Sequence, residues 1–384
     1  AMEPCRDRAA LNAVAAQLRC PYLLLEAGSN GTEIVALIRR MSLVIAMRLH
    51  TLIFAAGQGT PVVGVSYDPK VTAFLRCIDG ECVELEDVSG GELCGLADAV
   101  KQIHDGDRVA FGGFAVYNKA MALTHEIIRA GLRHLTIVGV ANSIEVDMLV
   151  GAGCVDAVET SYMGLEKFGL AKNFRRAAQA GVLKITHYPE LISWDRFRAS
   201  QEGLSFWPTY LLGGSDIVKY NDKIIPFPDP ITGRQMWAVP AADPDVALIH
   251  MWKGDKWGNL QTQPRRMNPQ SVDITVSRAC KRVIATVEHL VDTEEIMRSP
   301  QSTTVPSFRT LSVTHVPHGS HPTMDLDVVA TDELHLQLYA DACQTEEGFR
   351  EYLDKYVYGV SSFAQYLELV GTEQVKALER SGYR

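Results

Sequence analysis

The sequence predicts an α/β protein with an open, mostly parallel sheet, preceded by a smaller βαβ piece. Short apolar runs bounded by turn residues alternate along the chain with segments whose apolar residues recur at helical spacing. Such alternation is typical of βαβ units, whose strands are parallel. The chain has 384 residues, too many for one ordinary domain, and the glycine-rich stretch 89–96 follows the acidic run 84–87. We therefore expect two parts, residues 1–95 and 96–384.

The composition excludes several classes of protein. Hydrophobic residues make up 47% of the chain and its formal net charge is −9, so we expect no nucleic-acid partner. No apolar stretch reaches the ~18–20 residues of a membrane span, and charged residues stand where a secretory signal would be apolar. The eight cysteines show no C-x-x-C pair and no zinc-type spacing with histidine, so no metal site is predicted. These features predict a cytoplasmic protein without a membrane partner.

The elements of the first part follow one another as helix and strand. Apolar spacing predicts helices over 7–18, 33–40 and 51–56, and strands over 22–26, 43–46 and 61–65. The last two strands flank a helix and should therefore be parallel neighbours.

The second part begins with a predicted helix over 97–104 and a strand over 108–111. Further strands are expected over 182–186 and 246–250, with a helix starting close to Glu190. Helices are expected over 346–358, and the closing segment 361–382 has Leu367, Val370 and Leu378 at helical spacing.

The first strand of the second part ends in a double glycine, Gly112-Gly113, followed by Phe114. Residues without a Cβ let a substrate oxyanion or a cofactor phosphate approach backbone N–H groups closely. This loop is therefore a candidate substrate site, and the alternative is a plain tight turn.

Five segments in a fixed order resemble the α subunit of the family I coenzyme A transferases, over about residues 96–371. They are Leu96–His104 with the Asp-Gly-Asp strand and Gly-Gly-Phe, Phe168–Arg176, Phe206–Thr209, Asp245–His250 with Asp255–Asn259, and Pro317–Thr323. The family pattern has Gly and Pro shortly after Gly-Gly-Phe, where this chain has Asn118 and Ala120, which leaves the shape of the loop open.

The resemblance implies an acyl-CoA:carboxylate CoA-transferase that works by double displacement. A glutamate attacks the acyl-CoA, and the glutamyl-CoA thioester passes coenzyme A to a second carboxylate. In the family the β subunit carries this glutamate in a Ser-Glu-Asn-Gly type signature, which this chain lacks. The resemblance thus implies a hetero-oligomer with a separate β subunit, with acyl-CoA and a carboxylate as substrates, and with no permanently bound cofactor.

Several polar residues are candidates for binding coenzyme A. The turn with Asp255, Gly258 and Asn259 follows a strand, and strand exits are where open α/β sheets bind ligands. Arg198, like Arg196, could bind carboxylates or phosphates, or could belong to a solvated helix face. We expect His250 to be a packed strand residue, whereas His321 could serve a turn or contact a ligand.

A related branch of the family hydrolyses a carbon–carbon bond in steroid-ring catabolism and carries its acting glutamate on the α chain. Glu190 stands in roughly the corresponding region, after a predicted strand and before an amphipathic helix. It is therefore the candidate catalytic residue for a CoA-dependent ring-opening hydrolase. The alternative is a carboxylate that interacts with the helix dipole.

The first part resembles the C-terminal half of the bacterial polysaccharide pyruvyltransferases, through residues 42–56 and 61–70. That resemblance implies half of a two-lobed glycosyltransferase-B-like fold. In the family an Arg-Leu-His triplet contacts the phosphoenolpyruvate donor, which assigns Arg48 and His50 to anion binding; the alternative is two surface residues of a loop. A pyruvyl transferase is therefore a rival function, and a fusion that serves assembly without catalysis is another.

Overall fold

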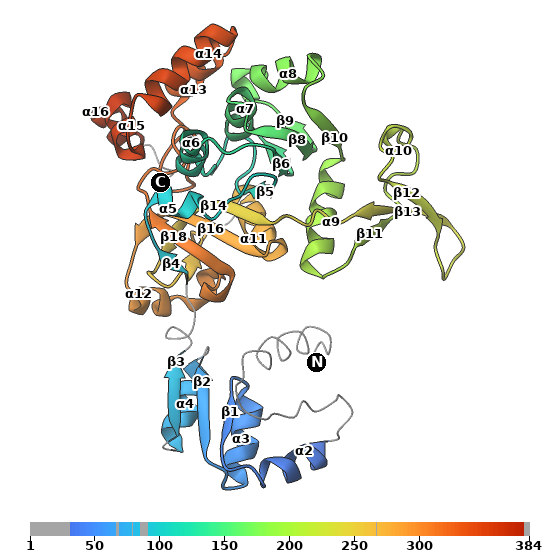
Figure 1. Ribbon diagram of the computed structural model, residues 1–384, viewed down its shortest axis with the longest axis vertical. Coiled ribbons are helices and arrows are strands. Elements are labelled where there is room, and N and C mark those ends of the chain that lie inside the picture. The colour runs from blue at the N-terminus through green and yellow to red at the C-terminus, as the bar shows by residue number, and fades with distance from the viewer. Residues whose placement is uncertain (1–30, 67–68, 79, 85–90, 266, 380–384) are drawn as a thin grey trace. The chain divides into compact units, whose positions relative to one another are not determined.

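The computed structural model describes residues 31–66, 69–78, 80–84, 91–265 and 267–379. Contacts divide the chain into two compact units, Ala1–Val88 (unit 1) and Ser89–Arg384 (unit 2), and each is described by itself (Figure 1). The helix expected over 7–18 and the strand expected over 22–26 lie outside the described residues.

Unit 1 contains a three-stranded parallel sheet in the order β1-β2-β3. Helix α3 connects β1 to β2, which confirms the predicted βαβ arrangement. Leu52 and Ala55 lie three residues apart on α3 and are fully buried, together with Leu75 of α4. The elements are α2 (Gly31–Ile38), β1 (Val44–Ala46), α3 (Leu49–Gly57), β2 (Val62–Ser66), α4 (Pro69–Cys77) and β3 (Glu81–Glu84).

Unit 2 is built on a large open sheet, as predicted. Its parallel strands run in the order β10-β8-β6-β5-β14-β16-β18-β4, and β15 and β17 continue antiparallel from β14. The strands are β4 (Glu92–Leu93), β5 (Arg108–Phe111), β6 (Leu135–Val138), β8 (Val155–Thr160), β10 (Lys184–His187), β14 (Val246–Gly254), β15 (Leu260–Gln261), β16 (Arg282–Leu290), β17 (Thr303–Val305) and β18 (Thr310–His315).

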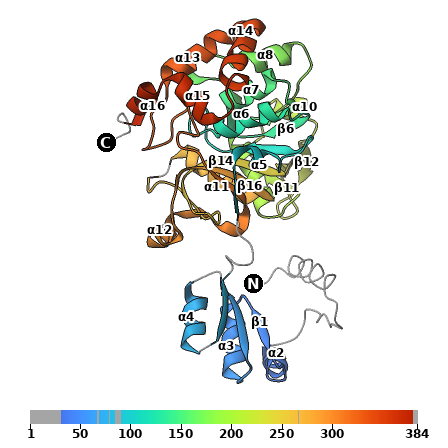
Figure 2. The ribbon, with the colours of Figure 1, turned by 60° about the vertical axis from the view of Figure 1, so that its left-hand side comes forward.

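Both faces of this sheet are buried, which explains the nearly continuous apolar strands. Successive side chains of a strand point to opposite faces. Val109 and Phe111 therefore pack into one hydrophobic cluster with α6, α7 and α13, while Ala110 packs into a second cluster with α11. Figure 2 shows the sheet between these helices.

Helices of unit 2 are found where they were predicted around Glu190, over 346–358 and over 361–382, whereas the helix expected over 97–104 ends at Val100. The closing segment forms two helices, and a π-helical segment, Asp354–Tyr358, continues α14. The helices are α5 (Leu96–Val100), α6 (Met121–Ala130), α7 (Ile144–Gly151), α8 (Lys172–Gln179), α9 (Glu190–Gln201), α10 (Ile217–Tyr220), α11 (Asn268–Ala279), α12 (Thr293–Arg298), α13 (Glu333–Ala342), α14 (Glu346–Leu353), α15 (Phe363–Val370) and α16 (Thr372–Glu379).

Two small sheets complete unit 2. One is an antiparallel sheet in the order β11-β13-β12, and the other is the parallel pair β7 and β9. Within the described residues, no helix combines the length and apolar character needed to cross a membrane. The strands are β7 (Ala141–Asn142), β9 (Tyr162–Met163), β11 (Phe206–Thr209), β12 (Ile225–Pro228) and β13 (Gln235–Pro240).

Candidate functional site

The Gly-Gly-Phe loop leaves the carboxyl end of β5, in the middle of the large sheet. Gly113 has a φ of +71°, and a Cβ there would lie 2.4 Å from the carbonyl oxygens of Tyr117 and Asn118. A Cβ on Gly112 would lie 2.0 Å from Oδ1 of Asp273. Gly113 therefore requires glycine for reasons of space as well as conformation, and Gly112 requires it for reasons of space.

The N–H groups of this loop all donate hydrogen bonds within the chain. Gly112 donates to the Leu248 carbonyl, Gly113 to Oδ1 of Asp273 at 2.8 Å, and Phe114 to the Tyr117 carbonyl. An oxyanion bound here would have to replace one of these acceptors. The predicted role of Gly112, Gly113 and Phe114 in substrate binding stays a prediction.

Asp273 of α11 and Asn118 hold the loop in place. The side-chain amide of Asn118 donates to Oδ2 of Asp273 at 2.8 Å and to the carbonyl of His250 at 3.1 Å. Burial raises the pKa of Asp273 to about 7, although the Gly113 and Asn118 donors lower it. Asn118 has a φ of +56°, a conformation that glycine and asparagine adopt most readily. An asparagine thus suits the position where the family pattern has glycine.

Lys119 and Glu145 form a fully buried ion pair beside the loop, with Nζ and Oε1 3.0 Å apart. The same ammonium donates to the carbonyls of Ala141 and Gly112. These contacts connect the loop to β7 and to the start of α7, so the loop has a firm support.

Two cavities lie beside the loop, and Tyr117 and Met324 line both. The larger one has a volume of about 530 Å³, and Phe114 contributes to its wall. The second has a volume of about 430 Å³ and includes Lys167, Glu166 and Glu333 in its lining. The larger cavity is lined by Phe114, Tyr117, Asn118, Arg265, Met267, Pro269, Met324 and Leu326.

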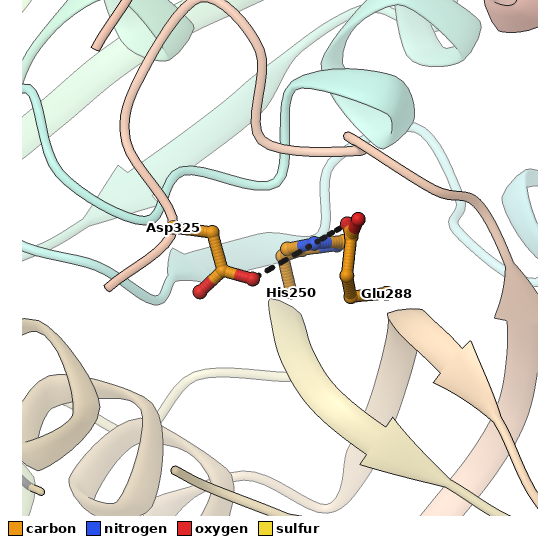
Figure 3. Close-up of side chains that lie close together, drawn as sticks. All are labelled: His250, Glu288 and Asp325. Carbon is orange, nitrogen blue, oxygen red and sulfur yellow. Dashed lines mark ion pairs between the residues drawn. The ribbon is translucent and has the colours of Figure 1, made fainter. Parts of the chain in front are cut away.

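His250, Glu288 and Asp325 come together in the interior of unit 2 (Figure 3). Nε2 of His250 lies 3.4 Å from Oε2 of Glu288 and 3.9 Å from Oδ2 of Asp325, and all three side chains are at most 4% exposed. Burial raises the pKa of Asp325 to about 7. His250 is a packed strand residue, as expected, because Nδ1 shares a hydrogen bond of 2.8 Å with the Thr286 hydroxyl.

His321 has structural partners on both ring nitrogens. Nδ1 lies 2.8 Å from the Tyr366 hydroxyl and Nε2 lies 3.1 Å from Oδ2 of Asp332. Burial lowers the pKa of His321, against the opposing effect of Asp332. These contacts favour the structural interpretation of this residue over a ligand contact.

The turn after β14 is held by the buried carboxylate of Asp255. Oδ1 accepts from the N–H groups of Trp257 and Asn259, and Oδ2 accepts from the Asn259 amide and the Thr293 hydroxyl. Gly258 has a φ of +86°, and a Cβ there would lie 2.7 Å from Thr310. The turn therefore has a structural role, and its predicted contact with coenzyme A stays a prediction.

Helix α9 carries three of the predicted site residues in different surroundings. Glu190 is the first residue of the helix and is exposed, three residues after the end of β10. Arg198 is half exposed and donates to Asp195 at 3.1 Å, with its guanidinium 5.4 Å from the Trp207 ring centre. Neither residue lines the cavities beside the Gly-Gly-Phe loop.

The environment of Arg196 fits neither of the two interpretations that the sequence suggested, which were a ligand-binding residue and a residue of a solvated helix face. It is 2% exposed and binds Glu159 of β8, which also binds Lys223 at 2.7 Å and Arg108 at 3.1 Å. Burial alone would raise the pKa of Glu159, but the three cations lower it to about 2. Arg196 is thus neither a solvated residue nor available to a ligand, because a carboxylate from a distant strand neutralises it.

Arg48 and His50 lie at the junction of β1 and α3 in unit 1, as the sequence predicted. Both are exposed, and Arg48 is the residue immediately before the helix. A helix N-terminus beside a guanidinium suits an anion. Binding of a donor molecule there stays a prediction.

Sequence reasoning missed Asp273, Asn118, Lys119, Glu145 and the group around His250. The signal that could have found Asp273 and Glu145 is an acidic residue among apolar positions of a buried helix, Val272–Val276 and Ile144–Leu149. A charge at such a position needs a partner, although the sequence does not say which one.

Family models match both parts of the chain. A coenzyme A transferase model matches residues 95–314, and a polysaccharide pyruvyl transferase model matches residues 28–69. An uncharacterized protein of Archaeoglobus fulgidus is 39% identical over 328 residues, 84% of this chain and 71% of that protein. The A subunit of the 3-oxoadipate CoA-transferase of Pseudomonas knackmussii is 32% identical over 279 residues, 72% of this chain and 96% of that protein.

Similar solved structures and a further group of relatives agree with this result. Glutaconate coenzyme A-transferase from Acidaminococcus fermentans has a TM-score of 0.71 at 27% identity, over 75% of this chain and 96% of its own. The cholesterol ring-cleaving hydrolase IpdA subunit of Rhodococcus jostii is 27% identical over 274 residues, 69% of this chain and 91% of that protein. On the strength of the model match over more than half its length, the chain belongs to the coenzyme A transferase family, and unit 2 is the domain that resembles the A subunits of these enzymes.

Proposed function

We propose that this chain is the α subunit of a hetero-oligomeric acyl-CoA:carboxylate CoA-transferase. The observation that carries the proposal is the match to nearly the full length of the A subunit of such an enzyme, 96% for the 3-oxoadipate CoA-transferase. An α subunit of this kind works with a second subunit, and this chain lacks the Ser-Glu-Asn-Gly signature. The nucleophilic glutamate is therefore supplied by a separate β subunit.

In this proposal unit 2 binds and orients the substrate and does not form the covalent intermediate. The Gly-Gly-Phe loop, held by Asp273 and Lys119, forms a firm wall beside a cavity of about 530 Å³. A rigid wall of this kind keeps a thioester carbonyl close to a nucleophile, which lowers the barrier through orientation. Asp255, Gly258, Asn259 and Arg198 are the further candidates for contact with coenzyme A.

The experiment that tests this proposal locates the covalent intermediate. The chain is purified under mild conditions with whatever protein accompanies it, incubated with acyl-CoA, and treated with borohydride, which reduces a glutamyl thioester to a stable alcohol. Mass spectrometry of the digested complex should find the reduced glutamate on the partner protein. A chain that has no partner and acquires no modification contradicts the half-site model.

A second function, CoA-dependent hydrolysis of a carbon–carbon bond, is favoured by the similarity to IpdA subunits and by the exposed position of Glu190. If Glu190 acts as a base, the complex forms no thioester on the partner, and Glu190→Gln lowers the rate of ring opening by more than about 100-fold. Glu202→Gln, at the exposed opposite end of α9, is the matched control and should leave the rate unchanged.

The family-model match over the short segment 28–69 favours a third possibility, which is a pyruvyl transfer site in unit 1. Phosphoenolpyruvate would then bind at Arg48 and His50, at the start of α3. Binding should raise the temperature at which unit 1 unfolds. The Arg48→Ala variant should lose this increase, and no increase in the unaltered chain contradicts the proposal.

A further inference from the structure

Three ionisable side chains from separate segments of unit 2 meet beside two central strands of the large sheet. His250 extends from β14, Glu288 from β16, and Asp325 from the segment between β18 and α13 (Figure 3). Their candidate ligand atoms all lie within 4.8 Å of one another, and the side chains are 0–4% exposed. Such a group cannot rely on water for compensation of its charges.

Two of the three atoms that face one another have no hydrogen-bond partner among the described residues, namely Nε2 of His250 and Oδ2 of Asp325. The remaining contacts hold the group in place. Nδ1 of His250 shares a hydrogen bond with the Thr286 hydroxyl, Oδ1 of Asp325 accepts from Gln263 at 2.7 Å, and Oε2 of Glu288, the third facing atom, accepts from the His318 N–H. The unpartnered atoms therefore point to one shared position.

A proton and a metal ion would fill that position differently. A proton on His250 can form one good hydrogen bond, which leaves at least one buried carboxylate oxygen uncompensated at a cost of about 1–3 kcal/mol. A divalent cation accepts a lone pair from all three atoms at once. An ion equidistant from atoms 3.4, 3.9 and at most 4.8 Å apart lies roughly 2.4 Å from each, within a few tenths of an ångström of zinc–ligand bonds.

We propose that His250, Glu288 and Asp325 bind a divalent first-row metal ion, with zinc as the best fit. One imidazole and two carboxylates suit zinc and neutralise its charge. Thr286 and Gln263 hold His250 and Asp325 in the way that outer partners orient metal ligands. The expectation of no metal site rested on sequence spacing, whereas these ligands come from three distant segments.

The position of the site indicates a structural role for the metal. Met324, next to the proposed ligand Asp325, accepts a hydrogen bond of 2.7 Å from the N–H of Asn118 and lines both cavities. The ion would therefore fix the segment that carries Met324 to β14 and β16, and with it one wall of the cavities. This inference is independent of the reaction proposed above.

The metal content of the 384-residue chain tests the proposal. After expression with added zinc and gel filtration in a chelator, elemental mass spectrometry should find about one zinc ion per chain. Refolding with excess zinc should raise the unfolding temperature above that of chain refolded with chelator. A folded chain that retains no zinc and unfolds at the same temperature in both conditions overturns the proposal.

Substitutions of the proposed ligands test whether the metal binds to these residues. Asp325→Asn and Glu288→Gln should lower zinc affinity by about 10–100-fold or more. The matched control is Asp332→Asn, because Asp332 also faces a buried histidine, His321, but both nitrogens of that ring have partners. Zinc content should stay at about one ion in this control. Equal zinc content in all variants places the metal elsewhere and overturns the proposal.

If the variants do not fold, a spectroscopic measurement of the unaltered chain identifies which types of side chain bind the metal. X-ray absorption of the cobalt-loaded, unaltered chain should show only nitrogen and oxygen ligands. Sulfur ligands would assign the metal to cysteine thiolates and overturn the proposal.

Discussion

Gly113 and Gly131 have the same φ of +71° but different surroundings. A Cβ on Gly131, at the end of α6, meets nothing within 4 Å, whereas a Cβ on Gly113 meets two carbonyl oxygens at 2.4 Å. Gly131→Ala should therefore cost only the backbone strain, about 1–2 kcal/mol. Gly113→Ala should cost about 2 kcal/mol more than Gly131→Ala, because the loop must move.

Urea unfolding of both variants measures this difference. Equal losses of unfolding free energy would show that the Gly-Gly-Phe loop shifts to accommodate a Cβ at little cost. That result would contradict the close packing around the loop. Gly131→Ala serves as the control for the conformational part of the effect.

His125 on α6 is fully buried, and neither ring nitrogen has a partner among the described residues. Its ring packs against Tyr366 and Phe363, with centres 4.7 and 5.3 Å away. Since an unsatisfied buried polar group costs about 1–3 kcal/mol, His125→Leu should stabilise the protein by about 1 kcal/mol at pH 7.

The same substitution should change the pH dependence of stability. Burial lowers the pKa of His125 well below its usual value, and Arg129 adds to the effect. Below about pH 6.5 the unfolded state therefore binds a proton that the folded state does not, and stability falls by up to about 1.4 kcal/mol per pH unit. The advantage of His125→Leu should grow between pH 7 and 5 in thermal unfolding, and a constant difference contradicts the assignment.

Asn118 illustrates how much of a single residue's role can be predicted from the sequence. Its departure from the family pattern was visible, but the left-handed conformation that explains it depends on Asp273, 155 residues away. A local property of the chain does not reveal such a partner.

At the scale of elements, the network of Glu159 connects β8, β5 and α9. Glu159 is 4% exposed and forms ion pairs with Arg196, Arg108 and Lys223. Glu159→Gln leaves Arg196 buried without a counter-charge and should cost about 3–5 kcal/mol at pH 7, measured by urea unfolding. A loss below about 1 kcal/mol would show that water reaches the network.

The pKa of Glu159, lowered to about 2 from 4.5, also predicts an acid effect. The carboxylate stabilises the folded state fully above about pH 4.5, and this contribution declines as the pH falls toward 2. Between pH 5 and 3 the unaltered protein should therefore lose more stability than Glu159→Gln. Parallel curves for the two proteins would contradict the ion-pair network as the cause.

Elements were more predictable than their surroundings. The strand over 108–111 has the predicted bounds, and α9 begins at Glu190 as expected. The interpretation of Arg196 as part of a solvated face was wrong, since amphipathic spacing on α9 does not reveal that β8 lies beside it with a carboxylate.

At the scale of the whole molecule, the chain consists of two compact units that divide between Val88 and Ser89. The match to the Archaeoglobus fulgidus protein covers 84% of the chain, more than unit 2 alone contributes, so the similarity extends into unit 1.

Independent units predict independent unfolding. A chain of residues 89–384 keeps β4 beside β18 and should fold with the same calorimetric transition that the full chain shows for unit 2. Acyl-CoA should raise this transition alone, because a ligand stabilises only the unit that binds it. A shift of more than about 5 °C on truncation would show that unit 1 contributes to the stability of unit 2.

The sequence by itself determined the α/β class, the two-part organisation and the positions of those elements that its periodicity singled out, such as the strand over 108–111 and the helix that begins at Glu190. Hydrophobic periodicity and turn residues are local signals, so they can be read directly from the amino-acid sequence. It also placed the double glycine at a strand exit. Only the tertiary structure decided that the Gly113 N–H belongs to Asp273, that Arg196 is neutralised by Glu159, and that His250, Glu288 and Asp325 meet. These pairings join segments brought together by the sheet order and the loops above it, and no local pattern encodes which buried charge faces which.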